Sequence, residues 1–93
     1  MTIGILNLFL YIPQSSSLKA KRQVLHCLKA RLRNSFNIAV TQLDDEDKWQ
    51  RAQLVVVGAE KKRETINSGL SRIINFVENF SRVELIDHQI ELL

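Results

Sequence analysis

An amphipathic segment at residues 17–36 constrains the fold of this chain more than any other stretch. Its large apolar side chains recur at spacings of seven, three, four and four residues, which places them on one side of a helix. They are Leu18, Leu25, Leu28, Leu32 and Phe36. Because such a helix must bury its apolar side, the flanking segments are expected to form the surface beneath it.

Residues 2–12 alternate with the period of two that is typical of a β-strand. One side of this strand is entirely apolar and includes Leu6 and Leu8, whereas the other side includes Phe9 and Tyr11. The same reasoning predicts one more helix and three more strands. The helix is expected at residues 60–80, and the strands at 37–43, 49–59 and 83–92.

The resulting order, βαββαβ, predicts a ferredoxin-like sandwich of the α+β class. In this fold a four-stranded antiparallel sheet carries both helices on one face, and we expect one domain over residues 1–93. The continuous apolar run in strand 49–59 leaves its orientation open. Either Leu54 and Val56 or Val55 and Val57 face the helices.

The charges are unevenly distributed along the chain. Residues 1–43 contain six Lys or Arg and no acid, whereas residues 44–93 contain ten acids and seven bases. The first half is therefore the candidate surface for a polyanion, although a solvated helix face would have the same composition. Three serines precede the helix, and an anion could bind there, at the N-terminal end of the helix where the helix dipole is positive. The candidate nucleic-acid or anion-binding residues are Ser17, Lys19, Lys21, Arg22, Lys29 and Arg33.

The sheet face opposite the helices is a second candidate surface. If the Leu6 side of the first strand packs on the helices, Phe9 and Tyr11 point outward. Such a patch favours self-association or a protein partner over the stacking of RNA bases. Trp49 and Arg51 could also anchor a partner, although Trp49 could equally cap one end of the core. Phe9, Tyr11, Trp49 and Arg51 are the candidate interface residues.

No catalytic signature is present at a meaningful spacing, so we expect no enzyme activity and no cofactor. The acidic run at residues 44–47 lacks the pattern of a calcium loop and is interpreted as a hairpin tip, so no metal is expected. The single cysteine, Cys27, favours a reducing cytoplasm. The apolar run at residues 3–12 is too short for a membrane span.

Two motifs resemble the YlxP-like family of small uncharacterised bacterial proteins. They are Ser-Leu-Lys-x-Lys-Arg at residues 17–22 and Trp-Gln-Arg-Ala at residues 49–52. The resemblance covers essentially the whole chain and implies a ferredoxin-like cytosolic protein. Genes of the family often lie beside those for a translation initiation factor and ribosome-binding factor A, which suggests a role near the ribosome or RNA. The chain departs from the family pattern at Ala20, where members have an acid, and at Lys48, where they have an apolar residue.

Three functions therefore remain open at this point. The first is a non-enzymatic module that binds RNA or the ribosome through the basic helix. The second is an interaction module that pairs with itself or with another protein through the open sheet face. The third, which has the least support, is a small enzyme acting on an anionic metabolite at the start of the helix.

Overall fold

The computed structural model describes residues 1–43 and 48–93, so the acidic run interpreted above as a hairpin tip lies outside the described residues. The six elements follow the predicted order, although their ends shift by up to three residues. They are β1 (Thr2–Tyr11), α1 (Leu18–Ser35), β2 (Ala39–Gln42), β3 (Arg51–Glu60), α2 (Arg63–Glu78) and β4 (Glu84–Leu92).

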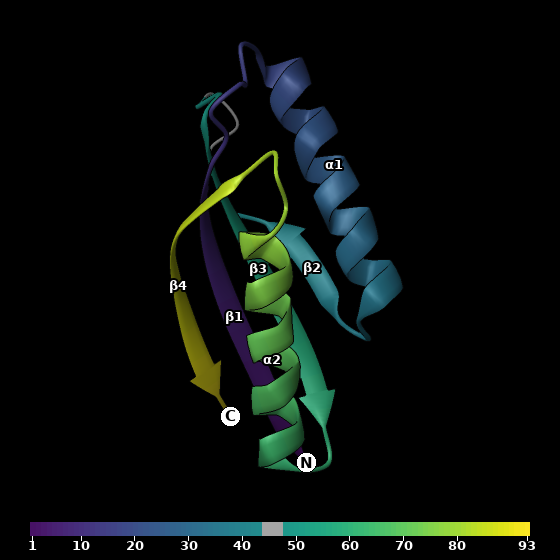
Figure 1. The fold of residues 1–93 in the computed structure, drawn as a ribbon. Helices are drawn as coiled ribbons and strands as arrows, with labels where there is room; N and C mark the ends of the chain where they lie inside the picture. The colour runs from purple at the N-terminus through teal and green to yellow at the C-terminus, as the bar shows by residue number, and fades with distance from the viewer. Residues whose placement is uncertain (44–47) are drawn as a thin grey trace.

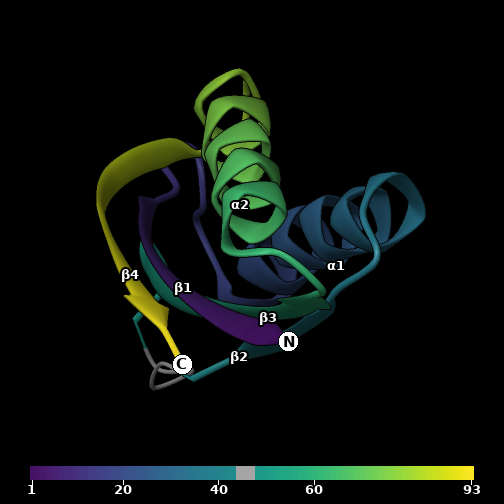
Figure 2. The ribbon, with the colours of Figure 1, turned by 90° about the horizontal axis from the view of Figure 1, so that it is seen from below.

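The strands form one antiparallel sheet in the order β2-β3-β1-β4, and both helices pack on the same face of it (Figures 1 and 2). The predicted ferredoxin-like α+β fold is therefore confirmed. Viewed along the strands, α1 lies over the β2 side of the sheet and α2 lies towards the β4 side (Figure 2). No helix in the described part of the chain is long and apolar enough to cross a membrane.

The register between β1 and β3 settles the orientation that the sequence left open. Leu6 lies opposite Val56 and Leu8 opposite Leu54, and residues directly opposite one another in a ladder share a face of the sheet. Leu54 and Val56 are fully buried under the helices. Val55 and Val57 consequently point to the open face.

The hydrophobic core lies between the sheet and the two helices. Near the end of α1 it includes an edge-to-face contact between Phe36 and Phe76, whose ring centroids are 6.1 Å apart. The most completely buried apolar side chains are Leu6, Leu8, Leu10, Ile12, Leu25, Leu28, Leu32, Leu54, Val56, Leu70, Ile73 and Val77. Because these side chains come from β1, α1, β3 and α2, the core couples both halves of the chain.

Two glycines allow α2 to approach the sheet closely. Gly4 of β1 lies opposite Gly58 of β3, and Ile66 of α2 packs over both. A Cβ atom added at Gly4 would lie 2.7 Å from Cγ1 of Ile66, and one added at Gly58 would lie 3.3 Å from its Cδ1. The missing side chains therefore make room for the start of α2, as glycine in a strand often does.

The last strand, β4, departs from strict alternation. A register shift occurs in the pairing of β4 with β1, so that Asp87 lies opposite Phe9 while Leu85 lies opposite Leu10. The extra residue, Ile86, disrupts the ladder as a β-bulge does. Ile86 therefore does not share a face with Ile90, although an unbroken alternation would place residues 86 and 90 on the same side of a strand. Both side chains are about half exposed, at 49% and 43%.

The two helices begin differently. Ser17 is the N-cap of α1, and its hydroxyl oxygen accepts a hydrogen bond of 3.1 Å from the backbone N–H of Ala20. Of the three serines before the helix, Ser17 is therefore the one that caps it. The second helix begins at Arg63 rather than at Glu60, because Glu60 remains in β3 opposite Thr2.

Candidate functional site

The exposed side of α1 and the edge strand β2 form a shallow, open hollow of about 490 Å³. We call this hollow the basic groove. Four of its side chains recur along α1 at spacings of three, four and three residues, so they lie in one row on the helix. The row consists of Lys19, Arg22, His26 and Lys29, and the lining is completed by Gln23, Leu25 and Gln42.

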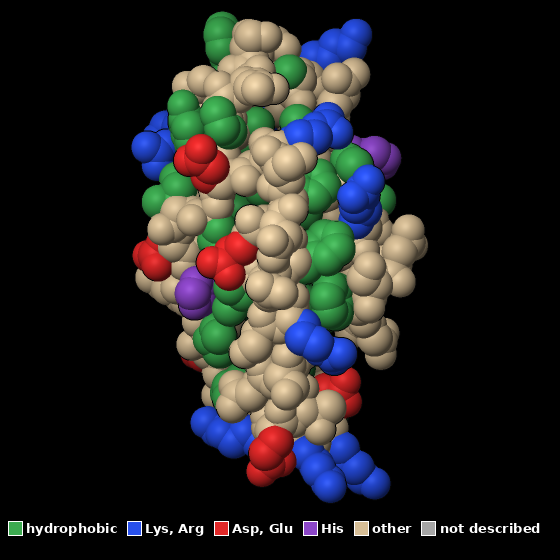
Figure 3. Space-filling model, viewed as in Figure 1, with side chains coloured by type: hydrophobic (Ala, Val, Ile, Leu, Met, Phe, Trp, Pro, Cys, Tyr) green, Lys and Arg blue, Asp and Glu red, His purple; other side chains and the backbone are tan. Residues whose placement is uncertain are grey.

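The electrostatics of the basic groove favour anions. None of the described residues that line it is acidic, and the first turn of α1 carries no acid. Over the upper part of α1, Figure 3 shows side chains of Lys, Arg and His, whereas acidic side chains lie mainly on the β4 side. Closely spaced cations reinforce one another's potential, so the groove should attract a polyanion.

Lys21 does not belong to this surface, contrary to the prediction. Only 2% of the residue is exposed, and its Nζ donates a hydrogen bond of 2.8 Å to the backbone carbonyl oxygen of Lys48. It joins α1 to the segment that leads into β3. Its ammonium is therefore a structural group and is not available to an external phosphate.

The sequence contains a signal for this burial that the prediction missed. The large apolar side chains of α1 leave a gap between Leu18 and Leu25, which are seven positions apart. Lys21 fills the gap at spacings of three and four, which is the position of a core residue in a helix. A lysine at such a position must either extend to the surface or find a buried partner, and here it finds one.

Two other predicted residues also have structural contacts. Nη2 of Arg33 donates a hydrogen bond of 2.9 Å to the carbonyl oxygen of Val40, which ties the end of α1 to β2. Ser17 caps the start of the helix. Arg33 nevertheless remains exposed, so a role beside the basic groove stays a prediction.

The open sheet face holds only part of the predicted interface. Phe9 and Tyr11 point outward and are each partly buried, as expected from the burial of the Leu6 side. The guanidinium of Arg51 lies over the Tyr11 ring, 5.7 Å from its centroid. Phe9 and Arg51 also line a hollow of about 220 Å³ together with Ile86.

Trp49 lies away from this face, at the end of the molecule where the β1–α1 loop runs. It is 51% exposed, so it does not cap the core. Its neighbours in an open hollow of about 580 Å³ come from that loop and from the segment just before β3. They are Pro13, Gln14, Ser15, Ser16 and Gln50.

Comparison with known proteins shows the family of the chain. The family model described as "Protein of unknown function (DUF503)" matches residues 3–90. The chain belongs to this family. It is also 29% identical over 82 residues to the "Uncharacterized protein YlxP" of Bacillus subtilis (strain 168), a match that covers 88% of this chain and 89% of the relative. The resemblance to YlxP-like proteins is therefore confirmed.

Solved structures similar to this DUF503 chain support the fold alone. A de novo designed protein, Foldit4, matches with a TM-score of 0.55 at 8% identity and covers 100% of this chain and 97% of its own. A mutant of SnoaB, described as a cofactor-independent oxygenase from Streptomyces nogalater, matches with a TM-score of 0.51 at 13% identity and covers 99% and 90%. At such identities a shared architecture carries no shared chemistry.

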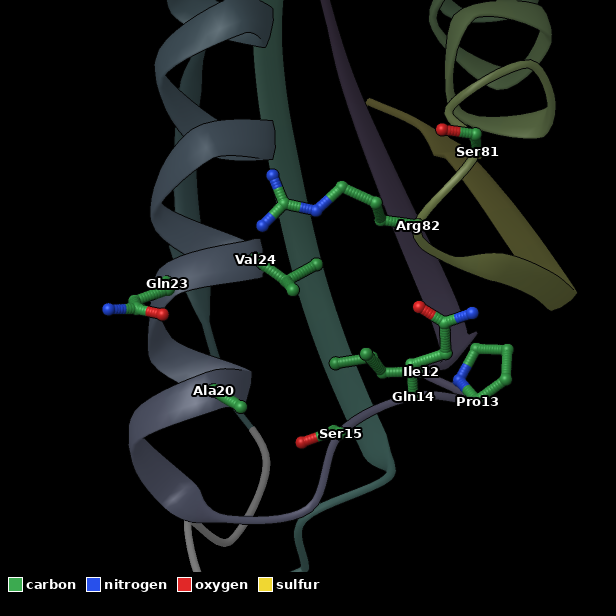
Figure 4. Close-up of a pocket in the computed structure, with 9 residues that line it drawn as sticks. All are labelled: Ile12, Pro13, Gln14, Ser15, Ala20, Gln23, Val24, Ser81 and Arg82. Atoms are coloured by element: carbon green, nitrogen blue, oxygen red, sulfur yellow. The ribbon is translucent and has the colours of Figure 1, made fainter.

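A further hollow of about 240 Å³ lies between α1, the β1–α1 loop and the turn before β4 of this DUF503 chain (Figure 4). Arg82 extends from that turn towards α1, while Ile12 and Val24 form an apolar floor. The hydroxyl of Ser15 is used inside the loop, where it donates a hydrogen bond of 3.1 Å to the carbonyl oxygen of Ser17. Within residues 1–43 and 48–93, no cluster of His, Cys, Asp and Glu could hold a metal ion.

Proposed function

We propose that this chain is a non-enzymatic module that binds RNA, free or on the ribosome, through the basic groove. The observation that carries the proposal is the row of Lys19, Arg22, His26 and Lys29 along one open hollow. A bacterial cytoplasmic location goes with it, because RNA and ribosomes are found there and the free thiol of Cys27 is compatible with a reducing compartment.

The shape and the spacing of the groove both suit an extended polyanion. From Lys19 to Lys29 the helix rises by about 15 Å, which is enough to contact several successive phosphates. The ammonium groups of Lys19 and Lys29 can each form a charge-assisted hydrogen bond to a phosphate oxygen. An open hollow leaves a bound chain free to continue past both ends, whereas a small metabolite is usually enclosed by its site.

Reversing two charges in the groove should weaken binding to RNA and reduce its dependence on salt. We expect Lys19→Glu with Lys29→Glu to lower the affinity for a structured RNA about 10-fold or more at low salt, and to flatten the plot of log affinity against log salt by about one to two units. The measurement is fluorescence anisotropy of a labelled RNA across a salt series, with ribosomal subunits as a second ligand.

A matched control is available at the start of α2. Lys61→Glu with Lys62→Glu changes the net charge by the same amount, at exposed positions outside the groove lining. This control should keep most of the affinity and the salt slope. Equal losses in both double variants would show that only net charge matters, and would remove the groove from the proposal.

The open sheet face supports a second candidate, which is self-association. Both helices cover the other face of the sheet (Figure 2). On the open face β1 and β3 present apolar side chains that are only partly buried, and Val57 is 38% exposed. A second copy of the chain would cover this central patch.

If two copies pair through this face, Phe9→Asp should shift the chain from dimer to monomer, because it places a charge in the buried centre of the contact. Sedimentation velocity over a range of concentrations measures the change. Ser68→Asp, on the exposed side of α2, is the control and should leave the mass unchanged. A wild-type chain that is monomeric at every concentration would exclude this candidate.

A further inference from the structure

Trp49 is the single tryptophan of the chain, and its placement is unusual for so large an apolar side chain. It is 51% exposed, and it forms one wall of the open hollow beside the β1–α1 loop. Large aromatic residues contribute most to stability when they are buried. An indole held in contact with water therefore points to a surface that another molecule covers.

The backbone on both sides of Trp49 is held in place. The carbonyl oxygen of Lys48 accepts the hydrogen bond from the buried Lys21 ammonium, at 2.8 Å. On the other side, the carbonyl oxygen of Gln50 accepts a hydrogen bond of 2.9 Å from the N–H of Ile12, and Nε2 of Gln50 donates to the carbonyl oxygen of Pro13 at 3.2 Å. The indole is consequently presented from a preorganised turn, which lowers the entropic cost of binding to it.

The hollow at Trp49 and the basic groove are lined by neighbouring stretches of the chain. The lining of the hollow ends at Ser16, and the lining of the groove begins at Lys19, three residues further along the chain. The β1–α1 loop and the start of α1 lie at the same end of the molecule as the start of β3 (Figure 1). A single extended ligand can therefore contact an aromatic face at one end and a row of cations beyond it.

We infer that the ligand of the basic groove is single-stranded RNA and that one of its unpaired bases stacks on the indole of Trp49. This inference rests on the proposed function and narrows it to a class of RNA. Unpaired bases stack on exposed aromatic side chains, while cations along a neighbouring groove follow the phosphates. Bases inside a duplex are already stacked on one another, so they are not accessible for stacking on the indole. The cations of the basic groove favour RNA over a protein partner, whereas the residues that line the hollow itself are uncharged.

The lone tryptophan also supplies a direct measurement. Addition of a short, unstructured, uridine-rich RNA should quench the emission of Trp49, whereas a duplex with the same number of phosphates should leave it nearly unchanged. Trp49→Ala should weaken binding to the unstructured RNA about 5- to 100-fold, the range expected for the loss of one stacked base. Trp49→Phe keeps an aromatic face and should restore most of the affinity.

The salt dependence distinguishes this role from that of the groove. Because Trp49→Ala removes no charge, it should lower the affinity without changing the slope of log affinity against log salt. The Lys19→Glu, Lys29→Glu variant changes that slope. Circular dichroism and the melting temperature of Trp49→Ala should match those of the wild type, since a half-exposed side chain contributes little to the core.

Three results would overturn the inference. If Trp49→Ala bound unstructured RNA as tightly as the wild type, the stacking contact would be excluded while the basic groove could still be the RNA site. If Trp49→Ala weakened binding to ribosomal subunits but not to free RNA, Trp49 would contact a protein instead. If the wild-type chain bound neither RNA nor subunits at low salt, the inference and the proposed function would both fail.

Discussion

Replacement of Lys21 by alanine should lower the free energy of unfolding by about 3 kcal/mol. The substitution removes a side chain that is only 2% exposed beneath α1, together with its 2.8 Å hydrogen bond to the carbonyl oxygen of Lys48. The aliphatic stem of Lys21 fills a position between Leu18 and Leu25 on the buried side of the helix. Its loss leaves a cavity, and the loss of the ammonium releases the segment that enters β3.

A methionine at this position separates the contribution of the buried aliphatic stem from that of the ammonium hydrogen bond. Lys21→Met keeps most of the buried stem and removes only the charged donor, so we expect a smaller loss of about 1–2 kcal/mol. Thermal unfolding measures both variants. For a chain of this size 1 kcal/mol corresponds to about 4–8 °C, so the alanine variant should melt at least about 12 °C lower.

A small change in melting temperature would contradict this prediction for Lys21. If Lys21→Ala melted within about 2 °C of the wild type, which is well under 1 kcal/mol, the lysine would not hold α1 to the entrance of β3. An exposed lysine of the same helix, Lys19, provides the control. Lys19→Ala removes a side chain from the exposed face of α1 and should change stability by less than about 0.5 kcal/mol.

A valine at Gly4 should destabilise the fold by about 2–3 kcal/mol, because it overfills the contact between β1 and α2. Its Cβ would lie 2.7 Å from Cγ1 of Ile66 and 3.0 Å from Cδ1 of Leu70. Both atoms belong to buried side chains of α2, so either these side chains or the helix that carries them must shift. The lower entropy of the unfolded chain and the better strand propensity of valine offset only part of this loss.

Gly69 provides the matched control, since it lies in the same α2 helix but faces open space. No atom lies within 4 Å of a Cβ added there, and alanine favours a helix interior over glycine by about 0.8–1.0 kcal/mol. Gly69→Ala should therefore raise the stability. Urea unfolding of both variants tests the pair, and a neutral or stabilising Gly4→Val would contradict the close approach of α2 to the sheet.

Most of the fold could be predicted because local periodicity reports which side of each element is apolar. The alternation in residues 2–12 correctly placed Leu6 on the buried side and Phe9 on the open side. The same periodicity failed in β4, where the extra residue Ile86 changes the alternation. A β-bulge depends on how the strand pairs with its neighbour, and the alternation of apolar residues does not record it.

The candidate site could be predicted only in part, for a related reason. Part of the row of cations on α1 could be found from the sequence, because Lys19, Arg22 and Lys29 belong to the first half of the chain, which contains six bases and no acid. Lys21 was assigned to the same surface because it carries the same charge. Its true position depends on Lys48, a residue distant in the sequence whose carbonyl oxygen gives the ammonium a partner.

By itself, the sequence determined the order of the elements, the ferredoxin-like fold and the excess of cations in the first half of the chain. The elements and their order follow from the apolar periodicity of each segment, and the excess of cations follows from composition. The tertiary structure alone decided that Lys21 is buried, that Val55 and Val57 face outward, and that Trp49 lies beside the β1–α1 loop. Each of these features depends on contacts between segments that are far apart in the chain. Such contacts are determined by strand register and close packing, which cannot be predicted from the pattern of residues within one segment.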